Sequence, residues 1–163
     1  MEQKKLLSIL TPCYNEAKNI ELLHARLLAT LEPFRSRYNF EFICTDNCSQ
    51  DNTFEILQKL GSQNPDFRSI RFSRNIGADR SVYLGLAQAK GDAAIVLQAD
   101  LQDPPEIVAE FIKNWELGYD VVFGQARSRE ENFIMRGFRR IYYRAITLMS
   151  EMAVPQNAGE FRL

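Results

Sequence analysis

Hydrophobic positions recur along this chain with two different spacings. Short apolar runs, typical of buried strands, are separated by longer segments whose apolar residues return every three or four positions, as in amphipathic helices. The runs predict strands at Leu6–Leu10, Phe40–Cys44, Ser69–Phe72, Ala93–Leu97 and Asp120–Phe123. The longer segments predict helices at Ala17–Leu31, Thr53–Leu60, Ala78–Ala89 and Glu106–Leu117. This alternation predicts an α/β fold with a mostly parallel central sheet flanked by helices.

Individual residues set several of the predicted boundaries. We expect Thr11–Pro12 to break the first strand, and Gly61 to cap the end of a helix. Asp51 or Asn52 is expected to cap the start of that same helix, and Asp103 the start of a later one. His24 lies on a predicted helix, where a surface position is expected.

The pattern changes over residues 130–152. A wide apolar surface there is interleaved with Arg136, Arg139, Arg140 and Arg144. Two interpretations stay open: a core-packing helix with a solvated basic face, or a helix that lies at a membrane surface or holds an anionic acceptor. Because the last residues read as the middle of a structural element, we expect the chain to be a piece of a longer protein.

Composition narrows the function classes. The 163 residues suffice for one domain with a substantial core. With 20 basic and 21 acidic residues, the net charge of −1 does not favour nucleic-acid binding. Three cysteines and a single histidine favour neither a zinc site nor a disulfide framework, and they fit a reducing cytoplasmic setting. No segment is apolar for long enough to span a bilayer.

Polar residues follow the strand Ala93–Leu97 directly. In α/β sheets, ligands bind outside the carboxyl ends of the strands. Asp100 and Gln102 are two positions apart, so on an extended backbone both side chains point the same way. A carboxylate beside an amide oxygen suits Mg²⁺ or Mn²⁺ bridging to phosphate oxygens. The sequence therefore predicts a cation site here.

Three other predicted strands also end in polar residues. Tyr14 and Glu16 follow the first strand and could stack on and hydrogen-bond a base. Asp46 and Asn47 follow the second and suit ribose or base donors, and Asn75 follows the third. Neither a G-x-x-x-x-G-K-[ST] phosphate loop nor a G-x-G-x-x-G turn is present, which argues against a phosphate-loop NTPase and a dinucleotide dehydrogenase. Together the strand ends predict a nucleotide site.

Six motifs follow or lead into the predicted strands. They are Thr-Pro-Cys-Tyr-Asn-Glu (11–16), Thr-Asp-Asn-Cys-Ser-Gln-Asp-Asn-Thr (45–53), Ser-Arg-Asn-Ile-Gly (73–77), Gly-Asp-Ala-Ala-Ile (91–95), Ala-Asp-Leu-Gln-Asp-Pro-Pro-Glu (99–106) and Gly-Tyr-Asp-Val-Val (118–122). These motifs resemble those of family 2 glycosyltransferases, in particular the polyprenyl-phosphate (dolichyl-phosphate) hexose synthases. The resemblance implies the GT-A fold and a single catalytic domain over 1–163. Residues 1–127 would form its nucleotide-sugar-binding core, and 128–163 an acceptor-side helix and the start of the final catalytic element.

The resemblance also implies roles for single residues. Pro12, Tyr14 and Glu16 would hold the nucleotide base, with Asp46 near the base or ribose. Asn47, Asn75 and Gln98 would belong to the same nucleotide-sugar site. Asp100 and Gln102 would ligate Mg²⁺ or Mn²⁺ on the diphosphate. Arg127 and Arg140 would meet the acceptor phosphate, and Asp100, Glu160 and Arg127 are the predicted catalytic residues.

Two positions depart from the family pattern. Gln98 stands where the family usually has the first acid of its Asp-x-Asp motif. It can hydrogen-bond a ribose or sugar hydroxyl, but it brings no charge. Glu160 stands where the family usually has Asp, and it keeps the charge while reaching one methylene further. If the acceptor were a sugar hydroxyl, Glu160 would be the leading general base.

The resemblance implies an inverting glycosyltransferase that moves a hexose from a UDP- or GDP-sugar to a polyprenyl phosphate. The full-length protein would be cytoplasmic, at the inner face of the cell membrane, and would meet the membrane through segments outside this chain. Its partners would be the donor and the lipid acceptor, with no nucleic acid, and self-association stays open. Two alternatives are a transferase acting on a saccharide hydroxyl in surface polysaccharide synthesis and a non-catalytic nucleotide-sugar-binding module.

Overall fold

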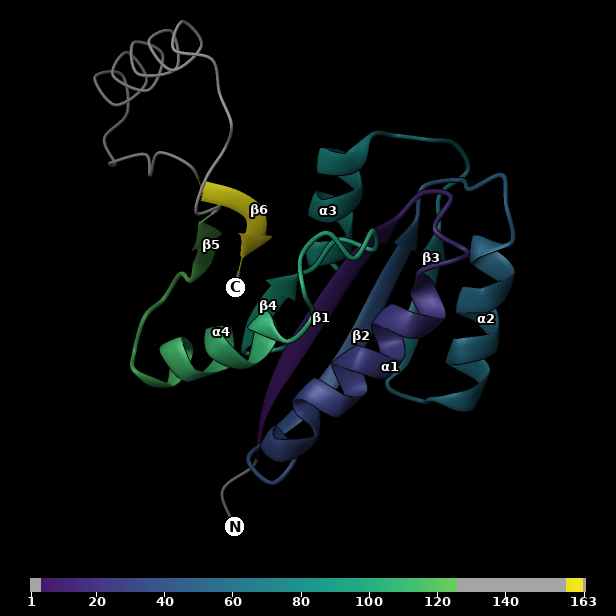
Figure 1. Cartoon of the computed structure of the whole chain (residues 1–163). Helices are drawn as coiled ribbons and strands as arrows, with labels where there is room; N and C mark the ends of the chain where they lie inside the picture. The colour runs from purple at the N-terminus through teal and green to yellow at the C-terminus, as the bar shows by residue number, and fades with distance from the viewer. Residues whose placement is uncertain (1–3, 126–157, 163) are drawn as a thin grey trace, which may run out of the picture.

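A computed structural model of the chain describes residues 4–125 and 158–162 as a sheet with helices on both faces (Figure 1). The strands are β1 (Lys5–Cys13), β2 (Tyr38–Asp46), β3 (Phe67–Arg71), β4 (Ala93–Val96), β5 (Phe123–Gln125) and β6 (Ala158–Arg162). The helices are α1 (Ile20–Leu31), the short 3₁₀ helix η1 (Glu32–Phe34), α2 (Thr53–Gln63), α3 (Ala78–Leu86) and α4 (Ile107–Glu116). The predicted α/β fold is confirmed.

The strands lie in the order β3-β2-β1-β4-β6-β5. Strands β1 to β4 are parallel to one another, whereas β6 runs antiparallel between β4 and β5. The pairing of β1 with β2 runs from Lys5↔Tyr38 to Cys13↔Asp46, so the two strands end at the same level. The loops that follow them therefore start side by side.

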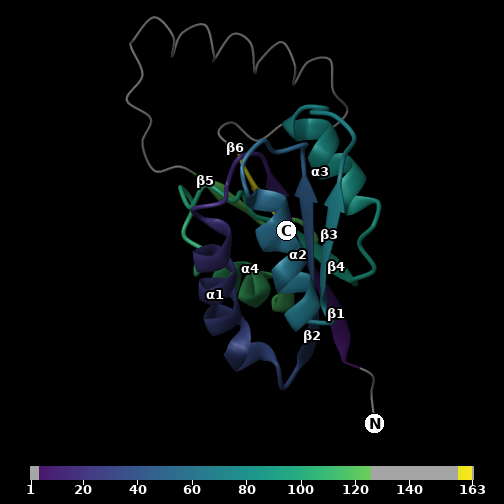
Figure 2. The same ribbon diagram turned by 90° about the vertical axis from the view of Figure 1, so that its right-hand side faces the viewer.

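Two apolar cores cover the two faces of the sheet. The larger core packs α1, α2 and α4 against residues such as Leu7, Ile9 and Phe42. The smaller core lies beneath α3 and centres on Leu10, Ile43 and Val96. Figure 2 shows α1 and α3 on opposite sides of β2 and β3. Among the described helices, none combines the length and hydropathy needed to span a bilayer.

The predicted break at Thr11–Pro12 is wrong, because β1 continues through Pro12 to Cys13. The Leu10 carbonyl accepts a hydrogen bond from the Leu97 N–H at 2.9 Å, so even-numbered residues of β1 direct their backbone groups toward β4. Pro12 faces the same side but lies beyond the last residue of β4. No ladder hydrogen bond is lost there, so a strand can hold a proline at this point.

Three other predictions about single residues are also wrong. Helix α2 continues past Gly61 to Gln63. Helix α4 begins at Ile107 with Glu106 as its N-cap residue, so Asp103 does not cap it. His24 is only 8% exposed, with its ring edge-on to Phe42 and Phe67 at 5.1 Å between centroids. Burial lowers the pKa of His24, so the side chain packs in the core as a neutral ring.

Helix α3 lies unusually close to β1 and β2. The hydroxyl groups of Ser81 and Thr45 are 2.9 Å apart and buried. One turn later, a Cβ added to Gly85 would clash with the Leu10 side chain and lie 3.1 Å from Thr45 Cγ2. The two small residues, Ser81 and Gly85, thus let the helix approach the sheet and fix its first turn at the carboxyl edge of the strands.

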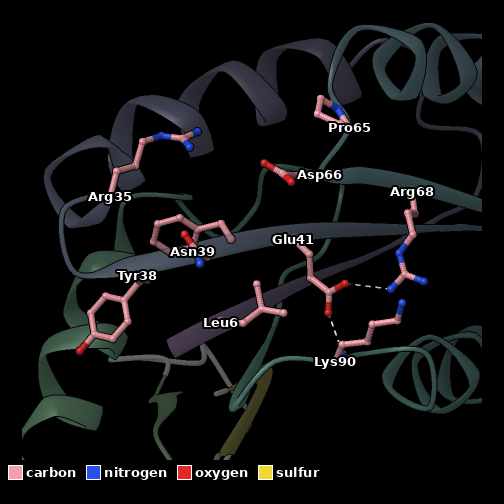
Figure 3. A pocket seen from close by; sticks show the side chains of 10 residues that line it. Leu6, Arg35, Tyr38, Asn39, Glu41, Pro65, Asp66, Arg68 and Lys90 are labelled. Carbon is pink, nitrogen blue, oxygen red and sulfur yellow. Dashed lines mark hydrogen bonds and ion pairs between the residues drawn. The ribbon is translucent and has the colours of Figure 1, made fainter. Parts of the chain in front are cut away.

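A hollow of about 450 Å³ lies at the opposite, amino edge of the strands, and Glu41 lies at its base (Figure 3). The Glu41 carboxylate accepts hydrogen bonds from Ser8 Oγ at 2.6 Å, from the Lys90 N–H at 2.7 Å and from Arg68 at 2.9 Å. Ser8 Oγ in turn accepts the Gly91 N–H at 2.9 Å. This carboxylate therefore ties β1, β2, β3 and the turn before β4 together, which is a structural role.

The Glu41 network predicts a loss of stability in acid. Burial alone would raise the pKa of Glu41, but the hydrogen bonds from Ser8, Lys90 and Arg68 and the charge of Arg68 lower it below the ordinary value of 4.5. A lowered folded-state pKa stabilises the fold above the unfolded-state pKa, and this stabilisation disappears as the pH falls through the folded-state pKa. We expect Glu41→Gln to lower the unfolding free energy by about 2 kcal/mol at pH 7. The difference from wild type should shrink below pH 4.5 in denaturant titrations.

Two helical glycines offer a matched comparison of packing. We expect Gly85→Ala to destabilise the fold by about 1–3 kcal/mol because the added methyl group overpacks the face beneath α3. A Cβ on Gly61 in α2 would meet nothing closer than the Phe67 carbonyl oxygen at 3.5 Å. Gly61→Ala should therefore stabilise the fold by about 1 kcal/mol through helix propensity alone. Equal effects of the two substitutions on thermal unfolding would contradict the close approach of α3.

Candidate nucleotide-binding site

A cavity of about 130 Å³ opens at the carboxyl edge of the sheet, between the ends of β1, β2 and β4 and the first turn of α3. Its lining residues come from four segments that are distant in sequence: Pro12, Cys13, Tyr14, Glu16, Asn47, Ala78, Ser81, Gln98, Ala99 and Asp100. Six of these were predicted, from the strand ends or from the family resemblance, namely Pro12, Tyr14, Glu16, Asn47, Gln98 and Asp100. The parallel strands bring these six residues together because their carboxyl ends share one edge.

Hydrogen bonds from backbone to side chain join the β1–α1 loop to the β2–α2 loop. The three consecutive N–H groups of Asn15, Glu16 and Ala17 donate to Ser49 Oγ, Thr53 Oγ1 and Asp51 Oδ2 at 2.9, 2.8 and 3.2 Å. In return, Asn15 Oδ1 accepts the Gln50 N–H at 2.8 Å. The wall that carries Tyr14 and Glu16 is therefore held by the loop that follows β2.

Asp51 also serves the start of α2, as predicted. Its Oδ1 accepts the Thr53 N–H at 3.0 Å. Burial alone would raise the pKa of Asp51, but hydrogen bonds from Thr53 and the Ala17 N–H lower it overall. The side chain of Asn52, the other candidate, makes no capping hydrogen bond.

Asn47 and Asn75 contact each other across the β2 and β3 ends. Asn47 Nδ2 donates to Asn75 Oδ1 at 3.1 Å, and the Ile76 N–H donates to Asn47 Oδ1 at 2.8 Å. Asn75 Oδ1 also accepts the N–H of Gly77, whose φ of 89° suits glycine and which precedes α3. Asn75 does not line the cavity. It supports Asn47 and the entry to α3 instead.

Asp46 lies behind the cavity wall and not in it. Its side chain is completely buried, and its Oδ1 accepts the Ser49 N–H at 3.1 Å. Its Oδ2 lies 3.2 Å from Arg71 Nε, and within the described part of the chain it accepts no hydrogen bond. Arg71 was not among the predicted site residues. The signal that could have identified it is its place on the strand beside β2, where it pairs in register with Asp46.

The backbone around Asp100 is not extended, so the prediction that the Asp100 and Gln102 side chains point the same way from an extended strand is wrong. Strand β4 ends at Val96, and Leu101 adopts a left-handed φ of 58°. The Gln102 N–H donates to Asp100 Oδ1 at 3.0 Å, which closes a tight turn. Of the two predicted metal ligands, Asp100 lines the cavity and Gln102 does not. Within residues 4–125 and 158–162, no three His, Cys, Asp or Glu side chains gather as a metal site.

The remaining predicted residues lie near or beyond the described site. Glu160 is in β6, whose Arg162 pairs with Val96 in antiparallel register. The backbone of Glu160 is therefore displaced from that pair toward the carboxyl end of β4. Arg127, Arg140 and the basic apolar segment 130–152 lie outside the described residues.

The cavity combines one aromatic ring, two carboxylates and two amides. Tyr14 is 42% exposed, so its ring is available for stacking. Glu16 Oε2 accepts a hydrogen bond from Asn19 Nδ2 at 2.7 Å, which orients it, while Asp100 is exposed. These groups can hydrogen-bond a donor-rich heterocycle or ribose and can share a cation with phosphate oxygens.

Comparison with known proteins identifies the family. Residues 8–159 match the family described as Glycosyl transferase family 2. The glycosyltransferase sll0501 of Synechocystis is 39% identical over 158 residues, which are 96% of this chain and 49% of that protein. The undecaprenyl-phosphate 4-deoxy-4-formamido-L-arabinose transferase of Photorhabdus laumondii is 34% identical, with 98% of this chain and 48% of that protein covered. The chain thus spans about half the length of the curated relatives it matches.

A solved structure supports the fold. The mannosyltransferase PcManGT of Pyrobaculum calidifontis, in complex with GDP-Man and Mn²⁺, superimposes with a TM-score of 0.60 at 20% identity. The match covers 84% of this chain and 39% of that one. The mixed sheet, the helices on both of its faces and the family match agree with each other. This chain belongs to glycosyl transferase family 2 and has the GT-A fold.

Proposed function

We propose that this chain carries the donor-binding part of an inverting glycosyltransferase that moves a hexose from a UDP- or GDP-sugar to a polyprenyl phosphate. The observation that carries the proposal is the cavity at the carboxyl edge, where Tyr14, Glu16, Asn47, Gln98 and Asp100 converge. Stacking on Tyr14 and hydrogen bonds to Glu16 and Asn47 would hold the nucleoside. Asp100, from the neighbouring strand end, would face the diphosphate.

One carboxylate at the cavity is a suitable ligand for a divalent cation. Mg²⁺ in phosphate sites usually takes one or two protein carboxylates and completes its shell with phosphate and water. Asp100 supplies one exposed carboxylate at the cavity, so it would hold Mg²⁺ or Mn²⁺ there. The cation would supply positive charge to the diphosphate leaving group.

The reaction needs little proton transfer from the protein. A phosphate oxygen of the acceptor attacks the sugar C1, the bond from C1 to the donor diphosphate breaks, and the electron pair leaves with that diphosphate. A phosphate monoester is largely ionised near neutral pH, so positioning counts for more than deprotonation. Arg127 and Arg140 would hold the acceptor phosphate, and Glu160 would take a base role if the acceptor were a saccharide hydroxyl.

The lipid acceptor is proposed from relatives. The Photorhabdus relative carries undecaprenyl phosphate in its name, and its match covers nearly the whole of this chain. Action on such a lipid would require the full-length protein to work at the cytoplasmic face of the membrane. The arginines and aromatic residues of segment 130–152 have the composition of a surface that meets anionic lipid.

A second candidate is a nucleotide-sugar-binding module without transferase activity. Gln98 favours it, because an amide at this cavity position supplies no charge for a metal. The two candidate functions differ in whether nucleotide binding depends on a metal ion and in whether a sugar is transferred.

Nucleotide binding with and without Mn²⁺ tests the site directly. We expect UDP or GDP to bind more tightly with Mn²⁺, and Asp100→Asn to reduce that gain about tenfold by removing the carboxylate ligand. Asp103→Asn, three positions later in the same loop and outside the cavity lining, is the matched control and should bind like wild type. Titration calorimetry gives both affinities. Metal-independent binding would favour the binding module.

Transfer itself is tested with the complete protein. Incubation with radiolabelled UDP- or GDP-hexoses, polyprenyl phosphate and Mn²⁺ should yield a labelled glycolipid whose anomeric configuration is opposite to that of the donor. Product on a soluble glycan, lost in Glu160→Gln, would instead identify a saccharide hydroxyl as acceptor. No product with any common donor would overturn the proposed activity.

A further inference from the structure

We propose that Arg71 is a positioning residue for the nucleotide site. It does not line the cavity, but it balances the charge of Asp46 and holds the β2–α2 loop, which presents Asn47 to the cavity and hydrogen-bonds the loop that carries Tyr14 and Glu16. Asp46, on this view, acts from behind the wall and not as a direct ligand. The inference rests on the proposed nucleotide-binding function.

Arg71 contacts three successive parts of the connection between β2 and α2. Its Nε lies 3.2 Å from Asp46 Oδ2 at the end of β2, and one of its terminal nitrogens donates to the Ser49 carbonyl at 3.1 Å. Its guanidinium lies over the Phe54 ring, 4.8 Å from the centroid, in the first turn of α2. A planar guanidinium makes these contacts together, whereas a lysine ammonium cannot.

The charge of Asp46 makes this contact important. A fully buried carboxylate is costly unless it is paired and hydrogen-bonded. Oδ1 accepts a hydrogen bond from the Ser49 N–H, but among the described residues Oδ2 has only the ion pair with Arg71. From β1, the facing titratable group is the thiol of Cys13, the register partner of Asp46. Contact with Cys44 and burial raise the pKa of Cys13 well above its usual value, so it stays neutral and brings no compensating charge.

The effect of Arg71 extends to the opposite wall through Ser49. The Ser49 backbone is held at its N–H by Asp46 and at its carbonyl by Arg71. Its side chain then accepts the Asn15 N–H, next to Tyr14. Releasing Arg71 should therefore loosen both the segment that presents Asn47 and the segment that presents Tyr14 and Glu16.

The test compares four variants of the chain: Arg71→Met, Arg71→Lys, the double variant Arg71→Met with Asp46→Asn, and Arg35→Met. Arg35 is the control because its side chain forms an ion pair with Glu32 on the surface and is not among the residues that line the cavity. Calorimetry with UDP and GDP should show affinity about tenfold weaker for Arg71→Met at pH 7. Arg71→Lys should be intermediate, and Arg35→Met unchanged.

The double variant separates charge balance from a general loss of structure. Adding Asp46→Asn to Arg71→Met should restore part of the affinity at pH 7, because the neutral amide removes the unbalanced charge of Asp46. Wild-type affinity in Arg71→Met, or a double variant no better than Arg71→Met, would overturn the inference.

Hydrogen exchange keeps this test distinct from the test of function. If the wild-type chain binds neither UDP nor GDP, the proposed function fails, but the positioning claim can still be judged. The amides of Asn15, Glu16 and Ser49 should exchange faster in Arg71→Met than in wild type, and at the wild-type rate in Arg35→Met. Unchanged exchange at these amides in a folded Arg71→Met variant would refute the positioning role.

Discussion

The parallel pairing of β1 with β2 is the interaction on which the rest of the structure depends. Both strands are nine residues long and pair along their whole length, so Cys13 and Asp46 end at the same level. The loops that follow start as neighbours and can exchange short hydrogen bonds between backbone and side chain. If the register shifted by one residue, Cys13 and Asp46 would lie on opposite faces of the sheet from each other, and the hydrogen bonds between the two loops could not keep their present pattern.

Much of the fold and part of the site could be predicted from the sequence. Continuous apolar runs predicted the central strands because β1 and β2 are buried on both faces, and the spacing of three to four residues predicted the helices because each buries one face. The strand ends predicted Tyr14, Glu16, Asn47, Gln98 and Asp100 because parallel strands share an edge. What could not be predicted depends on contacts distant in sequence. Pro12 stays in its strand because the neighbouring strand is shorter, His24 packs between two phenylalanines, and Arg71 faces Asp46 only once β3 has paired with β2.

Three loops at the carboxyl edge contain residues in the left-handed region: Asn15, Cys48 and Leu101, with φ of 59°, 61° and 58°. None of them is glycine, so each costs conformational energy, most clearly the bulky Leu101. Each follows a different strand around the same cavity. Such strain persists where the surroundings fix the backbone, and here the surroundings are the hydrogen bonds between the loops and the turn closed by Asp100. The positions of the polar side chains of the site are thus set by the backbone conformation of the three loops as well as by their own rotamers.

The position of β6 has a consequence for the order in which the molecule forms. Strands β1 to β4 are complete once residue 96 has been made, but the outer edge of β4 finds its partner only at residue 162. During synthesis, β4 therefore remains an open edge while more than sixty further residues are added. Its unpaired backbone groups can recruit a strand from another chain in that interval. Rapid burial of Ile95 and Val96 under the helices on either face is the protection available to the nascent chain in that interval.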